Sequence, residues 1–221
     1  MTELFIDIHT HRSDRKRAIV NLFHNDETEP NGFVSQGLHP WHIDEQQYFA
    51  QLELLQTKLS SSKVLAIGEC GLDALQPTPF KAQKEVFLWH CRRSEDLSKP
   101  LIIHCVKSFN QLIEIKQSFS PSQGWVVHGY RSGIGVAGQL VNHGFYLSLG
   151  TNLLGDPEKL KAYLDMIPLS RMFFESDENA TDVQAIYEFS SDYLNISLAE
   201  FTSIISNNFA SVFKKHAGEL E

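Results

Sequence analysis

Short apolar runs alternate with longer amphipathic stretches along most of the chain. Eight runs have the length and the β-branched and aromatic content of buried strands, at 4–9, 18–23, 33–38, 63–69, 100–105, 125–130, 145–150 and 172–177. From the third run onward, apolar side chains recur at helical spacing over 44–59, 80–97, 108–119, 133–143, 157–166, 182–194 and 197–216. Such alternation predicts parallel βα units, and eight strands predict a TIM-type (β/α)8 barrel of the α/β class.

The first two connections do not fit this alternation. Only about nine residues, rich in Arg and Lys, separate the first two runs, whereas a parallel crossover takes roughly a dozen or more. The next gap, HNDETEPNG, is a turn-rich acidic loop too short for a normal helix. We therefore expect residues 12–32 to form a hairpin-like excursion in which the second strand could run antiparallel. The barrel is predicted to be distorted or trimmed around its first three strands.

Polar residues stand where six of the predicted strands end. In the segment FIDIHTHR, alternation along a strand places Asp7, His9 and His11 on one face. The other strand ends carry His39 in GLHPW, Glu69 in GECGLD, His104 in IIHC, His128 in VVHG and Asp177 in ESD. In a parallel barrel these ends meet at one mouth, where chemistry collects. A single histidine there is usually structural, but a group of them without a ligand would be costly to bury.

This donor set predicts a metal site. Imidazole nitrogen and carboxylate oxygen suit Zn²⁺, Mn²⁺, Fe²⁺, Ni²⁺ and Co²⁺. Two ions about 3.5–4 Å apart would share a bridging ligand and use roughly six or seven donors, which the strand ends supply. A competing motif, GIGVAG at 133–138, fits the glycine pattern of a dinucleotide-binding turn. The next predicted strand lacks the acidic tip that such a site uses, so we interpret this motif as a helix start.

Composition limits the partners of the chain. The 221 residues suit a single domain over 1–221, with 42% hydrophobic and 21% charged residues. A net charge of −8 argues against a broad basic surface for long duplex DNA. Small anionic substrates and single-strand ends stay open, because divalent cations can reverse the local field. With no long apolar run, we expect a cytoplasmic protein with no membrane contact and no obligate protein partner.

The order of these motifs resembles that of the TatD family of metal-dependent deoxyribonucleases, and the resemblance covers nearly the whole chain. It includes the closing segment NNFASVF. The resemblance implies that His9 and His11 bind a first metal ion and that His104 and His128 bind a second. Glu69 would bridge the two ions. Asp177 would complete the first site and position or deprotonate the attacking water.

Other roles follow from the same resemblance. Asp7 is placed to orient a ligand histidine from behind the metal site. His39 is expected to contact substrate phosphate or a ligand. The family usually carries an arginine after the second-site histidine, whereas this chain reads HCVKS, so Lys107 is predicted to take the phosphate contact. The chain also departs from the family in HGY and in ESDEN, where Glu178 adds negative charge beside the site.

We therefore predict a metal-dependent hydrolase with two divalent ions, drawn from Zn, Mn, Mg, Ni, Fe or Co. Its most favoured activity is that of a phosphodiesterase or deoxyribonuclease. It would trim DNA ends or short single strands with metal-activated water, using Glu69 and Asp177 as catalytic residues. One alternative is a hydrolase of a small amide, lactone or phosphoester on the same metal site. The other is a non-catalytic binding protein stabilised by metal.

Overall fold

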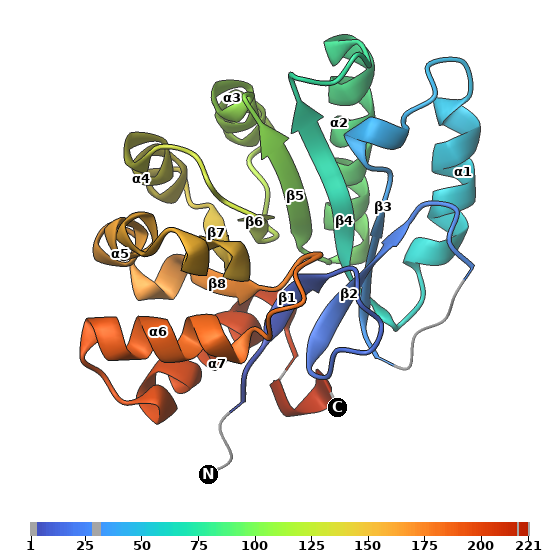
Figure 1. Cartoon of the computed structure of the whole chain (residues 1–221). Coiled ribbons are helices and arrows are strands. Elements are labelled where there is room, and N and C mark those ends of the chain that lie inside the picture. Colours follow the sequence, from blue (N-terminus) through green and yellow to red (C-terminus); the bar gives the residue numbers. More distant parts are fainter. Residues whose placement is uncertain (1–3, 28–31, 216, 221) are drawn as a thin grey trace.

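The structure, a computed structural model, describes residues 4–27, 32–215 and 217–220. Eight strands form one sheet in the order β1 to β8, and all neighbouring strands are parallel (Figure 1). They are β1 (Asp7–Thr10), β2 (Ala18–Phe23), β3 (Val34–Gly37), β4 (Val64–Asp73), β5 (Leu101–Val106), β6 (Trp125–Val127), β7 (Tyr146–Gly150) and β8 (Met172–Glu175). A parallel bridge between Thr10 and Asp177 joins the two ends of the sheet. The predicted (β/α)8 barrel is confirmed.

In the described part of the chain, seven α-helices accompany the strands on the outside of the barrel (Figure 1). They are α1 (Tyr48–Leu59), α2 (Phe80–Leu97), α3 (Phe109–Phe119), α4 (Ile134–Asn142), α5 (Pro157–Met166), α6 (Gln184–Leu194) and α7 (Leu198–Phe213). Each lies within a range predicted from helical periodicity. Side-chain caps begin two of them: Asp156 accepts from the backbone N–H of Lys159, and Ser197 from that of Glu200. Short 3-10 helices are η1 (Pro40–His42), η2 (Thr151–Gly155), η3 (Leu169–Arg171) and η4 (Ala217–Leu220).

The expectation that β2 could run antiparallel is wrong. β2 is parallel to β1 and to β3. The connection to β2 can be short because β1 has only four residues and rises roughly 13 Å. The residues between them, 11–17, can reach back over more than 20 Å, roughly, when extended. A helix is therefore not needed to make this crossover.

The barrel is trimmed where the sequence predicted it. The described parts of the first two connections, 11–17, 24–27 and 32–33, contain no helix. Residues 28–31 of the predicted excursion lie outside the described residues. Elsewhere the strands are covered by helices and their apolar side chains form one continuous core, with Trp125, Phe173 and Phe209 fully buried. Among the described helices, none has the length and apolar character needed to cross a membrane.

Candidate metal centre

The polar residues at the strand ends meet in one cavity at the mouth of the barrel. The carboxyl ends of parallel strands share this end of the fold, so side chains that are distant in sequence come together there. The cavity has a volume of about 380 Å³. Its lining consists of His11, Phe23, His39, Trp41, His42, Glu69, His104, His128, Asp177 and Glu178.

Glu69, from β4, stands at the centre of the cluster, and its two carboxylate oxygens face different imidazoles. Its Oε2 atom lies 3.5 Å from Nε2 of His9 and 3.8 Å from Nε2 of His11. Its Oε1 atom lies 2.8 Å from Nε2 of His128 and 3.1 Å from Nδ1 of His104. This is the arrangement that a carboxylate bridging two metal ions requires.

Asp177 completes the group around His9 and His11. Its Oδ1 atom lies 3.6 Å from Nε2 of each histidine. The side chain is 33% exposed, whereas that of Glu69 is 5% exposed, so Asp177 is the carboxylate that opens toward solvent. Its backbone has a φ of 55°, a left-handed conformation that is uncommon for a residue with a side chain. Two hydrogen bonds hold this conformation: the backbone N–H of Asp177 donates to the carbonyl of His9, and the carbonyl of Asp177 accepts from the N–H of His11.

The donor set fits divalent metal ions. Both ring nitrogens of His9 are buried and have no hydrogen-bond partner among the described residues, which is costly unless something else binds them. Separations of 3.5–3.8 Å between donor atoms are close to those of ligands about 2.1 Å from one shared ion. Four groups of three side chains among the described residues could each hold a metal ion. One consists of His9, His11 and Asp177, and another of His9, Glu69 and His128. Nitrogen and carboxylate donors favour transition metals over Ca²⁺.

The surroundings shift the pKa values of these side chains in different directions. Burial would lower the pKa of His128, but the charges of Glu69 and Glu175 raise it well above its ordinary value, so this ring must lose a proton to bind a metal ion. Burial lowers the pKa of His11 and that of His39, which favours neutral rings. Burial alone would raise the pKa of Glu69, but the charge of His128 and hydrogen bonds from the surrounding histidines hold it well below its usual range. Glu69 is therefore ionised and able to bind cations.

Two buried carboxylates orient the histidines from behind. Asp73 Oδ2 lies 3.1 Å from Nε2 of His104, and Glu175 Oε1 lies 3.3 Å from Nδ1 of His128. In a neutral ring the nitrogen that faces the carboxylate carries the proton, which leaves the other nitrogen free to bind a metal ion. Sequence reasoning assigned no role to either carboxylate. Asp73 lies four residues after Glu69 in β4, but the strand predicted over 63–69 ends before it.

A glycine in β4 lets the two central strands approach each other. Gly71 has a φ of 146°, and a Cβ atom added to it would lie 1.9 Å from the carbonyl oxygen of His104. Any side chain at this position would push β5 away from β4. The glycine in the GECGLD motif therefore keeps Glu69 and His104 at binding distance.

Three other predicted residues have defined positions. His39 Nδ1 accepts from Trp41 N–H, so its Nε2 carries the proton and donates to Glu69 Oε1 over 3.0 Å. His39 thus supports the carboxylate of Glu69. Asp7 accepts from the backbone N–H of His9 and from the N–H and hydroxyl of Ser176. Its recorded contacts join β1 to the end of β8 and do not reach a histidine ring; burial raises its pKa to about 7. Lys107 follows β5, is exposed, and is not among the residues that line the cavity.

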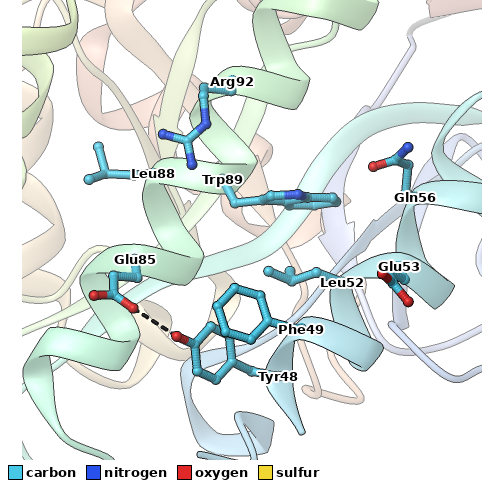
Figure 2. A pocket seen from close by; sticks show the side chains of 9 residues that line it. All are labelled: Tyr48, Phe49, Leu52, Glu53, Gln56, Glu85, Leu88, Trp89 and Arg92. Atoms are coloured by element: carbon cyan, nitrogen blue, oxygen red, sulfur yellow. Dashed lines mark hydrogen bonds between the residues drawn. The ribbon is translucent and has the colours of Figure 1, made fainter.

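A second cavity, of about 430 Å³, lies between α1 and α2 on the side of the barrel (Figure 2). Tyr48, Phe49 and Trp89 line it, and Tyr48 donates to Glu85 over 2.8 Å. None of the four groups of potential metal ligands found among the described residues includes a residue of this cavity. The chemistry therefore belongs to the mouth of the barrel.

Comparison with known proteins identifies the family of the chain. The family model described as TatD related DNase matches residues 4–214. The "Uncharacterized metal-dependent hydrolase YcfH" of Escherichia coli K12 is 26% identical over 207 residues, which cover 86% of this chain and 77% of that protein. An "Uncharacterized metal-dependent hydrolase" of Buchnera aphidicola is 33% identical over 152 residues, or 66% of this chain. That match spans only 56% of the Buchnera protein.

Solved structures show the same fold. The crystal structure of YJJV, a TatD homologue from Escherichia coli K12, superposes with a TM-score of 0.80 at 20% identity and covers 96% of this chain and 98% of its own. A hydrolase of the TatD family from Entamoeba histolytica superposes with a TM-score of 0.75 at 19% identity, with the same coverage. Since the family model matches almost the entire chain and the fold agrees, this chain belongs to the TatD-related DNase family and is a metal-dependent hydrolase of that family.

Proposed function

We propose that the protein is a phosphodiesterase that removes nucleotides from DNA ends or from short single strands. One observation carries this proposal: Glu69 turns each carboxylate oxygen toward a different group of imidazoles, while Asp177 opens toward solvent beside one of them. A closed structural site needs a single ion and no solvent-facing carboxylate. A bridged pair with an open side is the arrangement used to hydrolyse phosphate esters.

The residues of the chain divide the work. His9, His11 and Asp177 would hold one divalent ion, His104 and His128 the other, and Glu69 both. Bound there, such ions supply Lewis acidity toward a phosphoryl oxygen and make water more acidic. Burial alone would raise the pKa of Asp177, but the neighbouring ring of His9, 3.6 Å away, and the charge of His128 hold it below its ordinary value. The carboxylate is therefore ionised and can accept a proton from attacking water.

The supporting residues keep this geometry fixed. Asp73 and Glu175 hold the rings of His104 and His128 in the tautomer that turns a free nitrogen toward Glu69. His39 donates to Glu69 and so helps to keep that carboxylate charged and directed inward. None of these groups needs to move during the reaction, which is how a preorganised site lowers a barrier.

The lining of the cavity favours short or end-bound substrates. Lys and Arg are missing from the lining residues, and Glu178 adds a carboxylate next to Asp177. Long duplex DNA is held mainly by many contacts between phosphates and basic side chains. A site without them suits a single phosphodiester that the metal ions attract. A small phosphoester, amide or lactone is a second candidate, because the cavity of about 380 Å³ is at the small end of ligand sites.

The test is hydrolysis of end-labelled single-stranded DNA by the purified protein loaded with Mn²⁺, Mg²⁺ or Zn²⁺, with EDTA as the metal-free arm. Glu69→Gln and Asp177→Asn keep the size of each side chain and remove its charge. We expect both to lower kcat by at least 100-fold, because a bridging ligand and a proton acceptor are lost. Glu53→Gln is the matched control, since Glu53 is an exposed carboxylate of the cavity between α1 and α2.

Several outcomes would contradict the proposal. DNA shortening that persists in EDTA would show that the reaction needs no metal ion. Equal activity in Glu69→Gln, Asp177→Asn and Glu53→Gln would show that neither Glu69 nor Asp177 is catalytic. If the metal-loaded protein leaves DNA intact but hydrolyses a phosphomonoester, an amide or a lactone from a small panel, the second candidate replaces the first. A cytoplasmic location and the lack of an obligate protein partner are part of the proposal and are tested by fractionation and by purification from the native host.

A further inference from the structure

Trp41 is an exposed aromatic residue held in a fixed position at the mouth of the barrel. It lies in η1, directly after β3, and is 55% exposed. Its indole N–H nevertheless donates to Asp73 Oδ2 over 2.7 Å, and Asp73 is only 2% exposed. A single exposed apolar residue is ordinary, but an indole whose N–H is held and whose face stays open offers a rigid surface for a flat ligand.

The indole borders the candidate metal centre. Trp41 lines the same cavity as Glu69 and Asp177. The rings of His39 and His104 meet it nearly at right angles, with centroid distances of 5.0 and 5.7 Å. Neither histidine is therefore stacked in parallel on the indole.

The aromatic wall continues beyond Trp41. Phe23, at the end of β2, and His42, in η1, also line the cavity, and their rings meet edge to face at 4.5 Å. Among the described residues that line the cavity there is no Lys or Arg, so the metal site is the main source of attraction for a phosphate. Affinity for the rest of the substrate must then come from these aromatic surfaces. A nucleobase suits them, because every base has a flat π-face that stacks on an aromatic side chain.

We propose that Trp41 is the stacking platform for the terminal base of single-stranded DNA, so that the adjacent phosphodiester lies over Glu69 and Asp177. This inference rests on the proposed phosphodiesterase function and names the part of the substrate that gives recognition. The platform accepts any base, because stacking does not read the hydrogen-bonding edges. It requires an unpaired end, because a base inside a duplex is already stacked on both faces.

A pair of substitutions isolates the stacking surface. Trp41→Phe and Trp41→Leu both remove the hydrogen bond to Asp73, so any effect that reaches His104 through Asp73 is the same in both. They differ in the aromatic face, which only phenylalanine keeps. The difference between these two variants therefore reports stacking, while their shared loss against wild type reports the hydrogen bond.

The experiment measures kcat and KM of the Mn²⁺-loaded protein on a single-stranded oligonucleotide. A matched oligonucleotide carries an abasic residue at the end that is attacked. On the intact strand we expect KM of Trp41→Leu to exceed that of Trp41→Phe by roughly tenfold, with most of the effect in KM. On the abasic strand the two variants should have the same KM. Circular dichroism and metal content of both variants check that each is folded and loaded.

A second readout does not depend on hydrolysis. Deoxyadenosine monophosphate should quench the tryptophan fluorescence of the wild-type protein, deoxyribose 5-phosphate should not, and quenching should be lost in Trp41→Phe. Equal KM values for the two variants on the intact strand, or quenching that persists without Trp41, would overturn the inference. Both results leave DNA hydrolysis itself in place. Loss of the proposed function would instead show as intact DNA in every arm, including wild type.

Discussion

The barrel has two sectors that differ in how far helices cover their strands, and both contribute residues to the candidate metal centre. In the sector from β4 to β8, helices follow the strands and cover their outer faces (Figure 1). In the sector from β1 to β3, the described parts of the first two connections contain no helix. On the outside of β2 and β3 lies a cavity of about 350 Å³, with Leu22 and Val34 in its wall. Both sectors nevertheless contribute to the metal centre, His9 and His11 from one, and Glu69, His104 and His128 from the other.

In the sector from β1 to β3, here called the uncovered sector, buried polar side chains connect the strands to one another. Asn21, in β2, accepts from the backbone N–H of Glu69 over 2.9 Å and from the hydroxyl of Ser35 over 3.1 Å. One side chain thus connects β2, β3 and β4. In this sector a hydrogen bond between strands therefore fixes the backbone of Glu69, without a helix.

The largest effect is expected from Gly71→Ala in the covered sector. The new Cβ would overlap the carbonyl oxygen of His104, and the residue would keep a φ that disfavours alanine. We expect a loss of about 3 kcal/mol or more in the free energy of unfolding, together with loss of activity, measured by urea denaturation. Gly135→Ala in α4 is the control, because nothing lies within 4 Å of its added Cβ. A Gly71→Ala protein within about 1 kcal/mol of wild type would show that β4 and β5 can separate without cost.

The next effect concerns His90, which links the two sectors. This residue of α2 is fully buried; its Nε2 accepts from Leu38 N–H at the end of β3, and its Nδ1 contacts the carbonyl of Val86. Burial lowers its pKa to about 4 from an ordinary value of 6.5. The unfolded chain therefore binds a proton in the range where the folded protein does not. Stability is complete above pH 6.5 and falls as the pH drops toward 4, by up to about 3 kcal/mol from this residue.

The measurement compares the free energy of unfolding of wild type and His90→Gln from pH 8 to pH 4. Glutamine can accept from Leu38 N–H and does not titrate, so the variant should lose less stability than wild type below pH 6.5. Above pH 6.5 the difference in unfolding free energy between the two proteins should be constant. If this difference stays constant down to pH 4, His90 is not a source of acid sensitivity.

The smallest effect on stability is expected from Asn21→Ala in the uncovered sector. It leaves the buried N–H of Glu69 without its acceptor, at a cost of about 2 kcal/mol. This hydrogen bond fixes the backbone of Glu69, the expected metal ligand. The affinity for Mn²⁺ should therefore fall roughly tenfold, measured by calorimetric titration. Asn25→Ala, in the exposed loop after β2, is the matched control. Unchanged Mn²⁺ affinity in Asn21→Ala would show that the uncovered sector does not position the metal centre through this contact.

The arrangement of strands and helices was predictable because periodicity is a local property. Residues two apart on a strand share a face, so the pair His9 and His11 could be placed together from the sequence alone. The direction of β2 was not predictable in the same way, because it depends on how far a short connection must reach and not on its composition. The two carboxylates behind the histidines were also missed: Asp73 and Glu175 gain their roles only from which ring each one meets across the barrel.

The substrate side of the site was the least predictable part. Lys107 was given a phosphate contact by position in a motif, whereas the structure leaves it exposed and away from the lining of the cavity. Trp41 was visible in the sequence as a neighbour of His39, but its bond to Asp73 joins residues 32 positions apart. Metal ligands follow from strand registers, while substrate contacts depend on loops and on the directions of single side chains.

The bridge between Thr10 and Asp177 makes part of the candidate metal centre depend on closure of the barrel. The same residue that joins the last strand to the first also delivers the carboxylate beside His9 and His11. A chain still emerging during synthesis, with β8 not yet docked, has the histidines but not the acid that completes their group. The group formed by His9, His11 and Asp177 is therefore complete only when the sheet has closed.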